Sequence, residues 1–248
     1  MKALILAAGY ATRLYPLTLH TPKALLPIRQ GVTILDTIVD KLEALEEISE
    51  VCVISNHRYI HAFEGWLRAR RPGKTIRLID DGSEAEEDKR GAIGDLQLAI
   101  EQMGVGDELL VVAGDNLFTF GLQDYVAYFH AAGTDCILVR EVEDAEELKR
   151  IGVAELDEDG RVLSFEEKPE RPRSRFGVYA LYLYRRETLP LVADYLKEGN
   201  NPDAPSHFPE WLYKRRELRA YLAQGAVYDI GTPEAYRHVS RLAAEGLL

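Results

Sequence analysis

The sequence has little of what marks a secreted or membrane-spanning protein. Its 248 residues contain two cysteines, Cys52 and Cys136, each inside a short apolar run and neither near a second cysteine or a histidine at zinc-site spacing. They are expected to be reduced core residues. No apolar run approaches the roughly 20 residues that cross a bilayer, and Ala3–Ala8 is too short for the core of a signal peptide. We expect a cytoplasmic protein with no membrane partner.

Positive charge is also scarce. The chain carries 30 Lys and Arg residues against 41 Asp and Glu residues, which gives a formal net charge of −11. A protein that binds a nucleic-acid backbone needs a basic face, so nucleic acid is not an expected partner. The histidines form no plausible catalytic site, and no Ser/His/Asp order stands out. A few local cations suffice to bind a small phosphate ligand, so that class stays open.

Short apolar runs alternate with helical patterns through the first half of the chain. Strands separated by helices of about 10–15 residues predict βαβ units and a largely parallel sheet. The predicted strands are Ala3–Leu6, Glu50–Ile54, Ile76–Ile79, Leu109–Ala113 and Asp135–Val139, and the predicted helices are about Thr33–Glu47, Tyr59–Ala69, Ile93–Met103 and Leu122–Ala132.

The second half has a different pattern. Val153–Leu156 and Val162–Phe165 flank Asp157-Glu158-Asp159-Gly160, which is typical of a hairpin, and Arg175–Tyr184 predicts one long strand. No linker separates the halves, so the simplest interpretation is a single domain over 1–248 with a cleft between them. Further predicted elements are the helices Glu187–Leu196 and Pro233–Ala244, an exposed loop over Asp80–Arg90 and a loop over Gly199–Ser206.

The first predicted strand runs into a loop of small residues, which lets a ligand approach the backbone closely. Arg13 lies at the end of this loop, and its guanidinium can bind phosphate. Lys23 directly follows Pro22, whose fixed φ presents the neighbouring side chain in one direction. With one glycine, the loop is neither the G-x-G-x-x-G dinucleotide fingerprint nor a Walker A loop. Phosphate binding and an ordinary surface position therefore both stay open for Arg13 and Lys23.

Two aspartates lie where ligands of an open parallel sheet bind. Asp115 follows the strand Leu109–Ala113, and Asp229 precedes a turn and the helix that Thr232 would cap. Mg²⁺ prefers one or two carboxylates together with phosphate oxygens. The two aspartates are predicted to hold Mg²⁺ if the fold brings them together; helix capping is the alternative for Asp115. Farther along, Glu167 and Lys168 form either a sugar-phosphate contact or an ordinary charged loop.

Taken together and in order, these motifs resemble the sugar-phosphate nucleotidylyltransferase family, which includes glucose-1-phosphate thymidylyltransferases and uridylyltransferases. The resemblance spans almost the whole chain. The motifs are Leu6-Ala7-Ala8-Gly9-x-x-Thr12-Arg13-Leu14, Pro22-Lys23-Ala24-Leu25-Leu26-Pro27, Gly114-Asp115-Asn116, Gly152-Val153-Ala154-Glu155, Glu167-Lys168-Pro169, Gly177-Val178-Tyr179 and Asp229-Ile230-Gly231-Thr232-Pro233.

The resemblance implies a Rossmann-like nucleotidyltransferase fold of the α/β class, with a mixed, mainly parallel central sheet flanked by helices. It implies a nucleotide-binding half over about 1–135 and a sugar-phosphate-binding half over about 136–248. Catalytic roles are implied for Arg13 at the triphosphate, Lys23 at the α-phosphate and Asp115, which would share Mg²⁺ with Asp229. The implied nucleotide contacts are Leu6, Ala7, Ala8, Gly9, Thr12, Arg13 and Gly91, and the implied sugar-phosphate contacts are Gly152, Glu167, Lys168 and Val178.

The implied reaction is Mg²⁺-dependent transfer of a nucleotidyl group from a nucleoside triphosphate to a sugar-1-phosphate, with release of pyrophosphate. Glucose-1-phosphate with dTTP or UTP is the expected pair. The chain departs from the family at Tyr10-Ala11, where a second glycine is usual, and this is expected to narrow the triphosphate entrance. It also departs at the acidic run Glu84–Asp88, which leaves the base open.

Three alternatives remain, and a homo-oligomer is left open. A cytidylyltransferase acting on choline phosphate or another alcohol phosphate would use an aromatic cage for choline, to which Tyr179 and Trp211 could contribute. A non-catalytic regulatory homologue would shed the charged site, which this chain retains. A nucleotide-sugar-dependent glycosyltransferase commonly carries Asp-x-Asp after the central strand, where this chain has Asp115-Asn116-Leu117.

Overall fold

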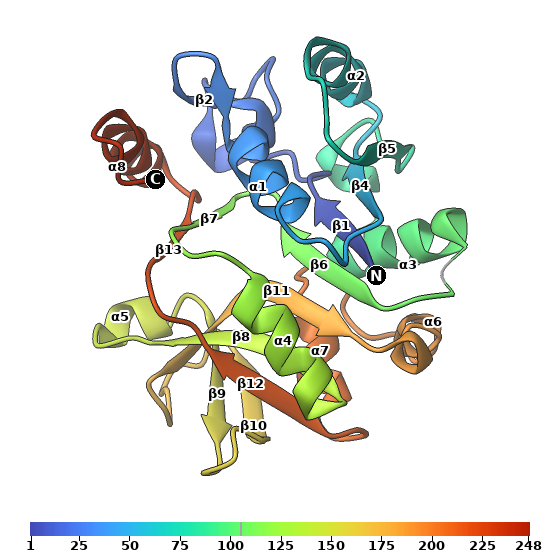
Figure 1. Ribbon diagram of the computed structural model, residues 1–248, viewed down its shortest axis with the longest axis vertical. Helices are drawn as coiled ribbons and strands as arrows, with labels where there is room; N and C mark the ends of the chain where they lie inside the picture. The colour runs from blue at the N-terminus through green and yellow to red at the C-terminus, as the bar shows by residue number, and fades with distance from the viewer. Residues whose placement is uncertain (105) are drawn as a thin grey trace.

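One mixed sheet of nine strands runs through the molecule (Figure 1). The computed structural model describes residues 1–104 and 106–248. The strand order is β10-β9-β11-β6-β1-β4-β5, with β8 also joined to β11 and β12 joined to β8. The predicted α/β class, a mixed and mainly parallel sheet flanked by helices, is confirmed.

The first half consists of parallel strands joined by helices, as predicted. Helix α1 (Ile34–Glu43) begins where Thr33 and Asp36 form a reciprocal capping box, and it ends earlier than the predicted Glu47. The other elements of this half are β1 (Lys2–Leu6), β4 (Glu50–Ser55), α2 (Ile60–Ala69), β5 (Thr75–Asp80), α3 (Ala92–Met103) and β6 (Leu109–Ala113).

Strand β11 (Phe176–Tyr184) joins the two halves, because its first part pairs with β9 and its last part with β6, both antiparallel. The predicted hairpin is confirmed: β9 (Gly152–Leu156) and β10 (Val162–Glu167) pair antiparallel, and Gly160 supplies a φ of 77° in the turn. The remaining elements of this half are α4 (Gln123–Ala132), β8 (Asp135–Glu141), α5 (Ala145–Leu148), α6 (Leu191–Lys197), α7 (His207–Leu212) and β12 (Leu218–Leu222).

Helices cover both faces of the sheet, so the core has two layers. Successive side chains of β1 point to opposite faces: Ala3 and Ile5 pack with residues of α1 and α4, whereas Leu4 packs with residues of α3, α6 and α7. Cys52 and Cys136 are free and buried, as predicted, and burial raises the pKa of each thiol to about 12.

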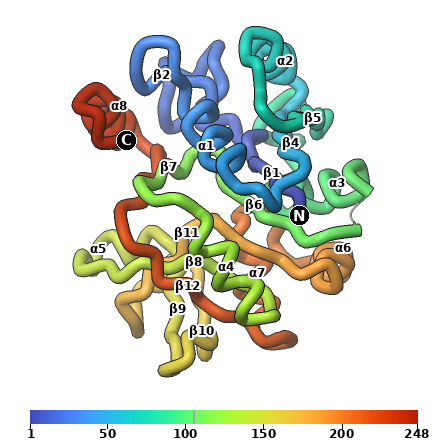
Figure 2. The backbone as a smooth tube through the Cα atoms, in the orientation of Figure 1, coloured from blue at the N-terminus to red at the C-terminus, as the bar shows by residue number. Residues whose placement is uncertain are grey.

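Two small sheets and the last helix lie beside the main sheet. Strand β7 (Asn116–Phe118) pairs with β13 (Val227–Asp229), and β2 (Pro27–Arg29) pairs with β3 (Val32–Thr33). Helix α8 (Pro233–Ala244) is capped by Thr232, as predicted. Figure 2 shows α8 returning from the second half to lie near β2, so the chain ends beside the first half.

Two predictions about local structure need correction. The predicted helix Glu187–Leu196 is divided into a 3₁₀ turn over Arg186–Thr188 and α6, which begins after Pro190. Proline lacks an amide hydrogen, so it favours the start of a helix over its interior. Helix α7 and strand β12 were not predicted, because their short apolar stretches show no clear period.

The segment Asp80–Arg90 was predicted to be an exposed loop, and this is wrong for part of it. Asp81 and Ser83 are buried, whereas positions 84–90 are exposed. The segment as a whole has the polar composition of a solvated loop, so its composition conceals the two buried side chains.

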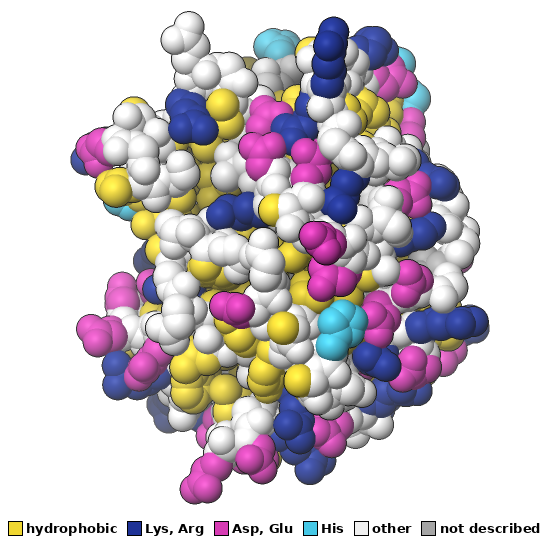
Figure 3. All heavy atoms as spheres, viewed as in Figure 1, with side chains coloured by type: hydrophobic (Ala, Val, Ile, Leu, Met, Phe, Trp, Pro, Cys, Tyr) yellow, Lys and Arg dark blue, Asp and Glu magenta, His cyan; other side chains and the backbone are white. Residues whose placement is uncertain are grey.

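The surface carries charges of both signs. Figure 3 shows them scattered over the face that carries α1 and α4, with apolar side chains between them toward β12, where Leu222 is 42% exposed. Among the helices of the described residues, none is long and apolar enough to span a membrane.

Candidate functional site

The loop after β1 is anchored by neighbouring strands. Leu6 O accepts a hydrogen bond from Gly114 N at 2.8 Å, Ala7 N donates to Ile54 O at 3.0 Å, and Ala8 O accepts one from Asn56 Nδ2 at 2.8 Å. The next residue, Gly9, is exposed, and a Cβ there would meet nothing within 4 Å. The anchors therefore fix the loop while leaving space for a ligand to approach its backbone.

Ala11 adopts a backbone conformation that favours glycine. Its φ of 51° is left-handed, which costs a residue with a Cβ roughly 1–2 kcal/mol. Thr18 Oγ1 donates a hydrogen bond to Ala11 O at 2.8 Å and supports the turn. The chain thus keeps a glycine-like conformation at the position where a second glycine is usual, and Thr12 and Arg13 beyond it are exposed.

Tyr10 does not narrow an entrance, contrary to expectation. Its side chain is buried, its ring lies 6.4 Å from that of Tyr59, and its hydroxyl donates to Ser83 Oγ at 3.2 Å. An apolar ring with one polar atom is well accommodated by a core that offers a single hydrogen-bond partner. Tyr10 therefore ties the loop to the segment that follows β5.

Lys23 and Asp115 meet at the carboxyl end of β6. Lys23 Nζ lies 2.7 Å from Asp115 Oδ2, and the side chains are 13% and 33% exposed. The close approach of β6 to the first loop requires Gly114, because a Cβ there would lie 2.8 Å from Leu6 O. This short contact is a charge-assisted hydrogen bond, and it joins Lys23 to the end of β6.

Asp229 is brought to Asp115 by the small sheet of β7 and β13. Asn116 is paired with Asp229, and Ile230 N donates to Asp115 O at 3.1 Å. Asp229 is exposed on one side and crowded by protein atoms on the others. This desolvation, followed by the negative charge of Asp115, raises the pKa of Asp229, whereas the charges of Lys23, Arg13 and Lys168 lower it.

The site therefore combines two neighbouring carboxylates with three cationic side chains whose charges act on Asp229. A pair of carboxylates whose mutual repulsion is incompletely neutralised fits a divalent cation. No group of three or more His, Cys, Asp or Glu side chains forms a metal site within residues 1–104 and 106–248. Two carboxylates leave coordination positions for substrate oxygens, which is the arrangement that Mg²⁺ prefers.

Three of the four predicted sugar-phosphate residues lie in one row of the sheet. Gly152 on β9 is paired with Glu167 on β10 and with Val178 on β11. A Cβ on Gly152 would lie 2.6 Å from the ring of Phe165 and 3.3 Å from Glu167 Oε2. The absence of a side chain at Gly152 therefore lets Phe165 and Glu167 pack over that strand.

Lys168 follows directly in a strained conformation. Its φ is 48°, its amide donates to Ile151 O at 3.1 Å, and its Nζ lies 3.3 Å from Glu167 Oε1. Its side chain is 59% exposed, whereas that of Glu167 is 12% exposed. Non-glycine residues in this conformation cluster at functional sites. The charge of Lys168 also acts on Asp229, so the sugar row and the carboxylate pair are neighbours.

Gly91 has a structural reason to be glycine. Its φ is 77°, and a Cβ would lie 2.6 Å from Pro202 O. The first amides of α3, those of Ala92 and Ile93, donate to Asp203 O and Pro202 O from the segment between α6 and α7. These amides are therefore occupied by protein carbonyls. Neither the loop composition of Gly199–Ser206 nor any motif indicated that this segment caps α3.

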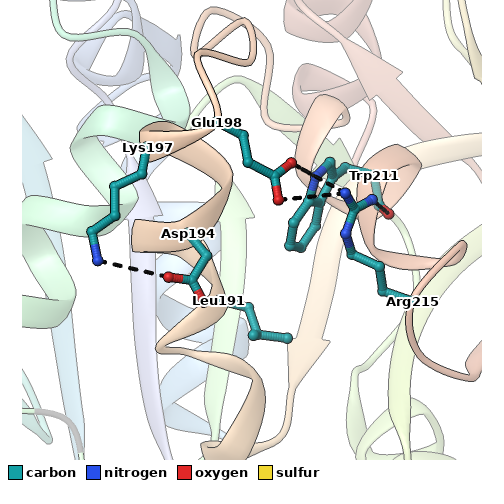
Figure 4. Close-up of a pocket in the computed structure, with 6 residues that line it drawn as sticks. All are labelled: Leu191, Asp194, Lys197, Glu198, Trp211 and Arg215. Atoms are coloured by element: carbon teal, nitrogen blue, oxygen red, sulfur yellow. Dashed lines mark hydrogen bonds and ion pairs between the residues drawn. The ribbon is translucent and has the colours of Figure 1, made fainter.

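Two surface recesses lie away from these residues. The recess of about 410 Å³ in Figure 4 lies between α6 and α7, where Arg215 stacks 3.9 Å over the Trp211 ring and Glu198 accepts from Trp211 Nε1. It contains none of the predicted site residues. Its lining residues are Leu191, Asp194, Lys197, Glu198, Trp211 and Arg215.

The order of the motifs, the strand-end positions of the aspartates and the sheet all agree with one family, and its sequence pattern, described as nucleotidyl transferase, matches residues 2–246. The chain belongs to the nucleotidyl transferase family. The bifunctional protein GlmU of Methanocaldococcus jannaschii is 28% identical over 238 residues, covering 94% of this chain and 52% of the relative. A glucose-1-phosphate thymidylyltransferase of Mycolicibacterium smegmatis is 27% identical, covering 94% of this chain and 78% of the relative.

The chain spans about half the length of the first curated relatives that it matches. Solved structures cover it more fully. A structure from Bacillus anthracis described as a glucose-1-phosphate thymidylyltransferase has 27% identity and a TM-score of 0.79, covering 98% of this chain and 95% of the other. A UDP-glucose pyrophosphorylase with 19% identity and a TM-score of 0.79, covering 99% and 98%, shares the fold. Other relatives are named adenylyl- and guanyltransferases, so the family leaves the base open.

Proposed function

We propose that this protein transfers a nucleotidyl group from a nucleoside triphosphate to a sugar-1-phosphate and releases pyrophosphate. An oxygen of the sugar phosphate attacks the α-phosphorus, and the bond from that phosphorus to the bridging oxygen of the β-phosphate breaks. The preferred pair is glucose-1-phosphate with dTTP or UTP. The nucleotide would bind over residues 1–135 and the sugar phosphate over 136–248.

The observation that carries the proposal is the meeting of Lys23, Asp115 and Asp229 from three distant parts of the chain. Asp115 and Asp229 would hold Mg²⁺, which when bound supplies positive charge to the phosphate oxygens. The exposed Arg13 would bind the triphosphate. The protein backbone would contact the nucleotide in the first loop and at the start of α3, at Leu6, Ala7, Ala8, Gly9, Thr12 and Gly91.

Electrostatics explains why cations rather than a general base serve this reaction. A phosphate monoester has a second pKa of about 6, so it is mostly a dianion at neutral pH and attacks without losing a proton to the protein. The difficulty is the approach of two anions, since two unit charges about 4 Å apart repel by roughly 4 kcal/mol at an effective dielectric constant of about 20. Lys23, Arg13 and Lys168 would offset this repulsion by positioned charge.

The sugar phosphate would lie against the row of Gly152, Glu167 and Val178. Glu167 would accept hydrogen bonds from sugar hydroxyls, and the exposed Lys168 would bind the phosphate. The absence of a side chain at Gly152 and the apolar side chain of Val178 would shape the floor of the pocket. The proximity of Lys168 to Asp229 supports this orientation, because it directs the sugar phosphate toward the carboxylate pair.

The choline phosphate alternative loses its specific support. Tyr179 is buried and its hydroxyl donates to Glu147 Oε1 at 3.0 Å, whereas Trp211 packs on Phe208 in the other core layer. The two rings therefore form no shared cage for a quaternary ammonium. The regulatory alternative is disfavoured because Lys23, Asp115 and Asp229 are kept together.

The deciding experiment is a matrix of ATP, CTP, GTP, UTP and dTTP against several sugar-1-phosphates and choline phosphate, read by pyrophosphate release with Mg²⁺. We expect release with glucose-1-phosphate and dTTP or UTP, and none with choline phosphate. Release with CTP and choline phosphate alone would establish the alternative. No release from any pair by a correctly folded protein would favour the regulatory homologue.

A further inference from the structure

A second pair of carboxyl groups is buried behind the predicted nucleotide loops. Asp81 follows β5 and is 2% exposed, and Asp95 lies in the first turn of α3 and is 6% exposed. Asp81 Oδ1 accepts hydrogen bonds from Ser83 N at 2.6 Å and from Ser83 Oγ at 2.8 Å. The site described above uses none of these three residues.

The two carboxyl groups lie close enough for each to shift the pKa of the other. Asp95 Oδ1 is buried and receives no hydrogen bond from any residue that the structure describes. Two ionised carboxylates are acceptors only, so a contact between them requires a proton on one. The burial of both groups and the unpartnered Asp95 Oδ1 therefore favour one proton between them.

The charges around the pair do not replace that proton. Arg90 lies nearby, but it is exposed and its Nε donates to the backbone oxygen of Asp81 at 2.6 Å. Asp80 adds a further negative charge beside Asp81. Lys89, on the same segment, is paired with Asp203. Burial, followed by the charge of Asp81, raises the pKa of Asp95 to about 8.

The pair is joined to both loops that are proposed to enclose the nucleotide, on one side by side-chain hydrogen bonds and on the other through the first turn of α3. Tyr10 OH donates to Ser83 Oγ at 3.2 Å, and Tyr10 directly follows Gly9 of the first loop. On the other side, Asp95 N donates to Gly91 O at 2.9 Å, which places Asp95 on the turn that Gly91 opens. The carboxyl pair therefore lies between the segment that holds Tyr10 and the helical turn that begins at Gly91.

We propose that Asp81 and Asp95 are positioning residues, whose shared proton holds the Tyr10 loop and Gly91 at the spacing in which the nucleoside triphosphate binds. The proposal rests on the proposed function for the identity of the ligand. When the proton is lost in alkaline solution, two buried carboxylates repel and the loops separate. Nucleotide binding then weakens, whereas binding of the sugar phosphate at the Gly152 row does not change.

The test is the pH dependence of the KM for each substrate in wild type and Asp95→Asn, between pH 6 and 10. The asparagine amide donates to Asp81 at every pH and so replaces the shared proton permanently. We expect the nucleotide KM of the wild type to rise about tenfold above pH 8, the size of one lost charge-assisted hydrogen bond. The nucleotide KM of Asp95→Asn stays level, and the sugar-phosphate KM follows the same curve in both proteins.

Glu101→Gln is the matched control, because Glu101 is an exposed carboxylate on the same helix. It should keep the wild-type profile. A level nucleotide KM in the wild type, or an alkaline rise that persists in Asp95→Asn, overturns the positioning role. If Asp95→Asn does not fold, Asp81→Asn places the same amide on the other side of the contact and is expected to give the same level profile.

The outcome is separable from that of the proposed function. Pyrophosphate release by the wild type together with an unchanged profile in Asp95→Asn removes the positioning role and leaves nucleotidyl transfer intact. If no substrate pair releases pyrophosphate, calorimetry with dTTP and UTP alone at pH 7 and pH 9.5 tests the pair directly. The positioning role is supported if nucleotide binding weakens at pH 9.5 in the wild type but not in Asp95→Asn. Equal Kd values in the two proteins, or no binding by either protein, overturn it.

Discussion

Two pairs of aspartates lie at the same edge of the sheet and are neutralised in opposite ways. Asp115 and Asp229 face Lys23, with Arg13 and Lys168 nearby, and both keep contact with solvent. Asp81 and Asp95 are buried and have a proton in place of an ion-pair partner. A carboxyl pair beside cationic side chains and solvent is suited to bind a metal ion, whereas a buried pair without such partners is suited to share a proton.

The largest expected effect comes from removing one charge of the exposed pair. Asp115→Asn and Asp229→Asn are each expected to lower turnover by about 100-fold to 1000-fold, the scale of losing one electrostatic contact to a transition state. Pyrophosphate release at saturating Mg²⁺ measures it. The melting temperature should hold, because neither side chain is part of the core.

Chelation gives an independent test of the same pair. EDTA should abolish pyrophosphate release by the wild type, and Mg²⁺ should restore it. Near wild-type turnover in either asparagine variant would show that the two aspartates do not share a metal. Asp124→Asn, an exposed aspartate on α4, is the control and should retain full turnover.

The exposed pair could be predicted from the sequence in part, and the buried pair could not. Asp115 comes shortly after β6 and Asp229 ends β13, so their placement at the carboxyl ends of strands was foreseeable. Their contact was not, because it depends on β7 and β13, which are three residues each and too short for a period. Asp81 lies in an acidic segment that looks solvated, and Asp95 is a single polar residue on an otherwise apolar helix face.

The contact of Gly91 with Pro202 could not be predicted either, because it also depends on packing between distant segments. The predicted helix Ile93–Met103 is confirmed as α3, which begins directly after Gly91. The partner that approaches Gly91 comes from a loop more than a hundred residues away, and local composition carries no signal for such packing. Motifs therefore indicate candidate residues, whereas packing between distant segments determines which atoms those residues contact.

The next largest effect concerns the stability of the buried pair. The pKa of Asp95 in the folded protein, about 8, exceeds the value of about 3.9 in an unfolded chain. A raised pKa means that stability is full below about pH 4 and is lost as pH rises toward 8. Asp95→Asn removes this titration and should be more stable than the wild type at pH 9, on the order of 2 kcal/mol. Urea unfolding at pH 5 and pH 9 measures it.

At pH 5 the two proteins should differ little, because the wild-type pair then holds its proton. If the wild type and Asp95→Asn have equal free energies of unfolding at pH 5 and again at pH 9, Asp95 is already ionised in the folded protein. Glu101→Gln again serves as the control, and its stability should follow that of the wild type across the range.

A smaller effect separates the two substrates. Lys168→Ala is expected to raise the KM for the sugar phosphate about tenfold, the size of one charge-assisted contact, while the KM for the nucleotide changes little. Calorimetry with each substrate alone checks the ranking. Lys149→Ala, an exposed lysine on the surface beside α5, should change neither value. A larger loss for the nucleotide would place Lys168 on the other side of the cleft.

The smallest expected effect concerns Ser83, which lies between Tyr10 and the buried carboxyl pair. Ser83→Ala removes the hydroxyl that links Tyr10 to Asp81 but keeps the backbone amide that also donates to Asp81. We expect a loss of about 1 kcal/mol in unfolding free energy, the net value of a buried hydrogen bond. The ionised carboxyl pair then has one hydrogen-bond donor fewer, so the pKa of the pair rises. The alkaline loss of nucleotide binding therefore moves to higher pH.

Ser49→Ala is the matched control, since the Ser49 hydroxyl donates to Met1 O at the exposed surface. It should cost less than about 0.5 kcal/mol and leave the pH profile in place. A shift of the profile in Ser83→Ala alone would join Tyr10, Ser83 and the carboxyl pair in one titrating unit. If both serine variants lose the same stability and keep the same profile, Ser83 only fills space, and the buried pair acts on the nucleotide loops through Gly91 alone.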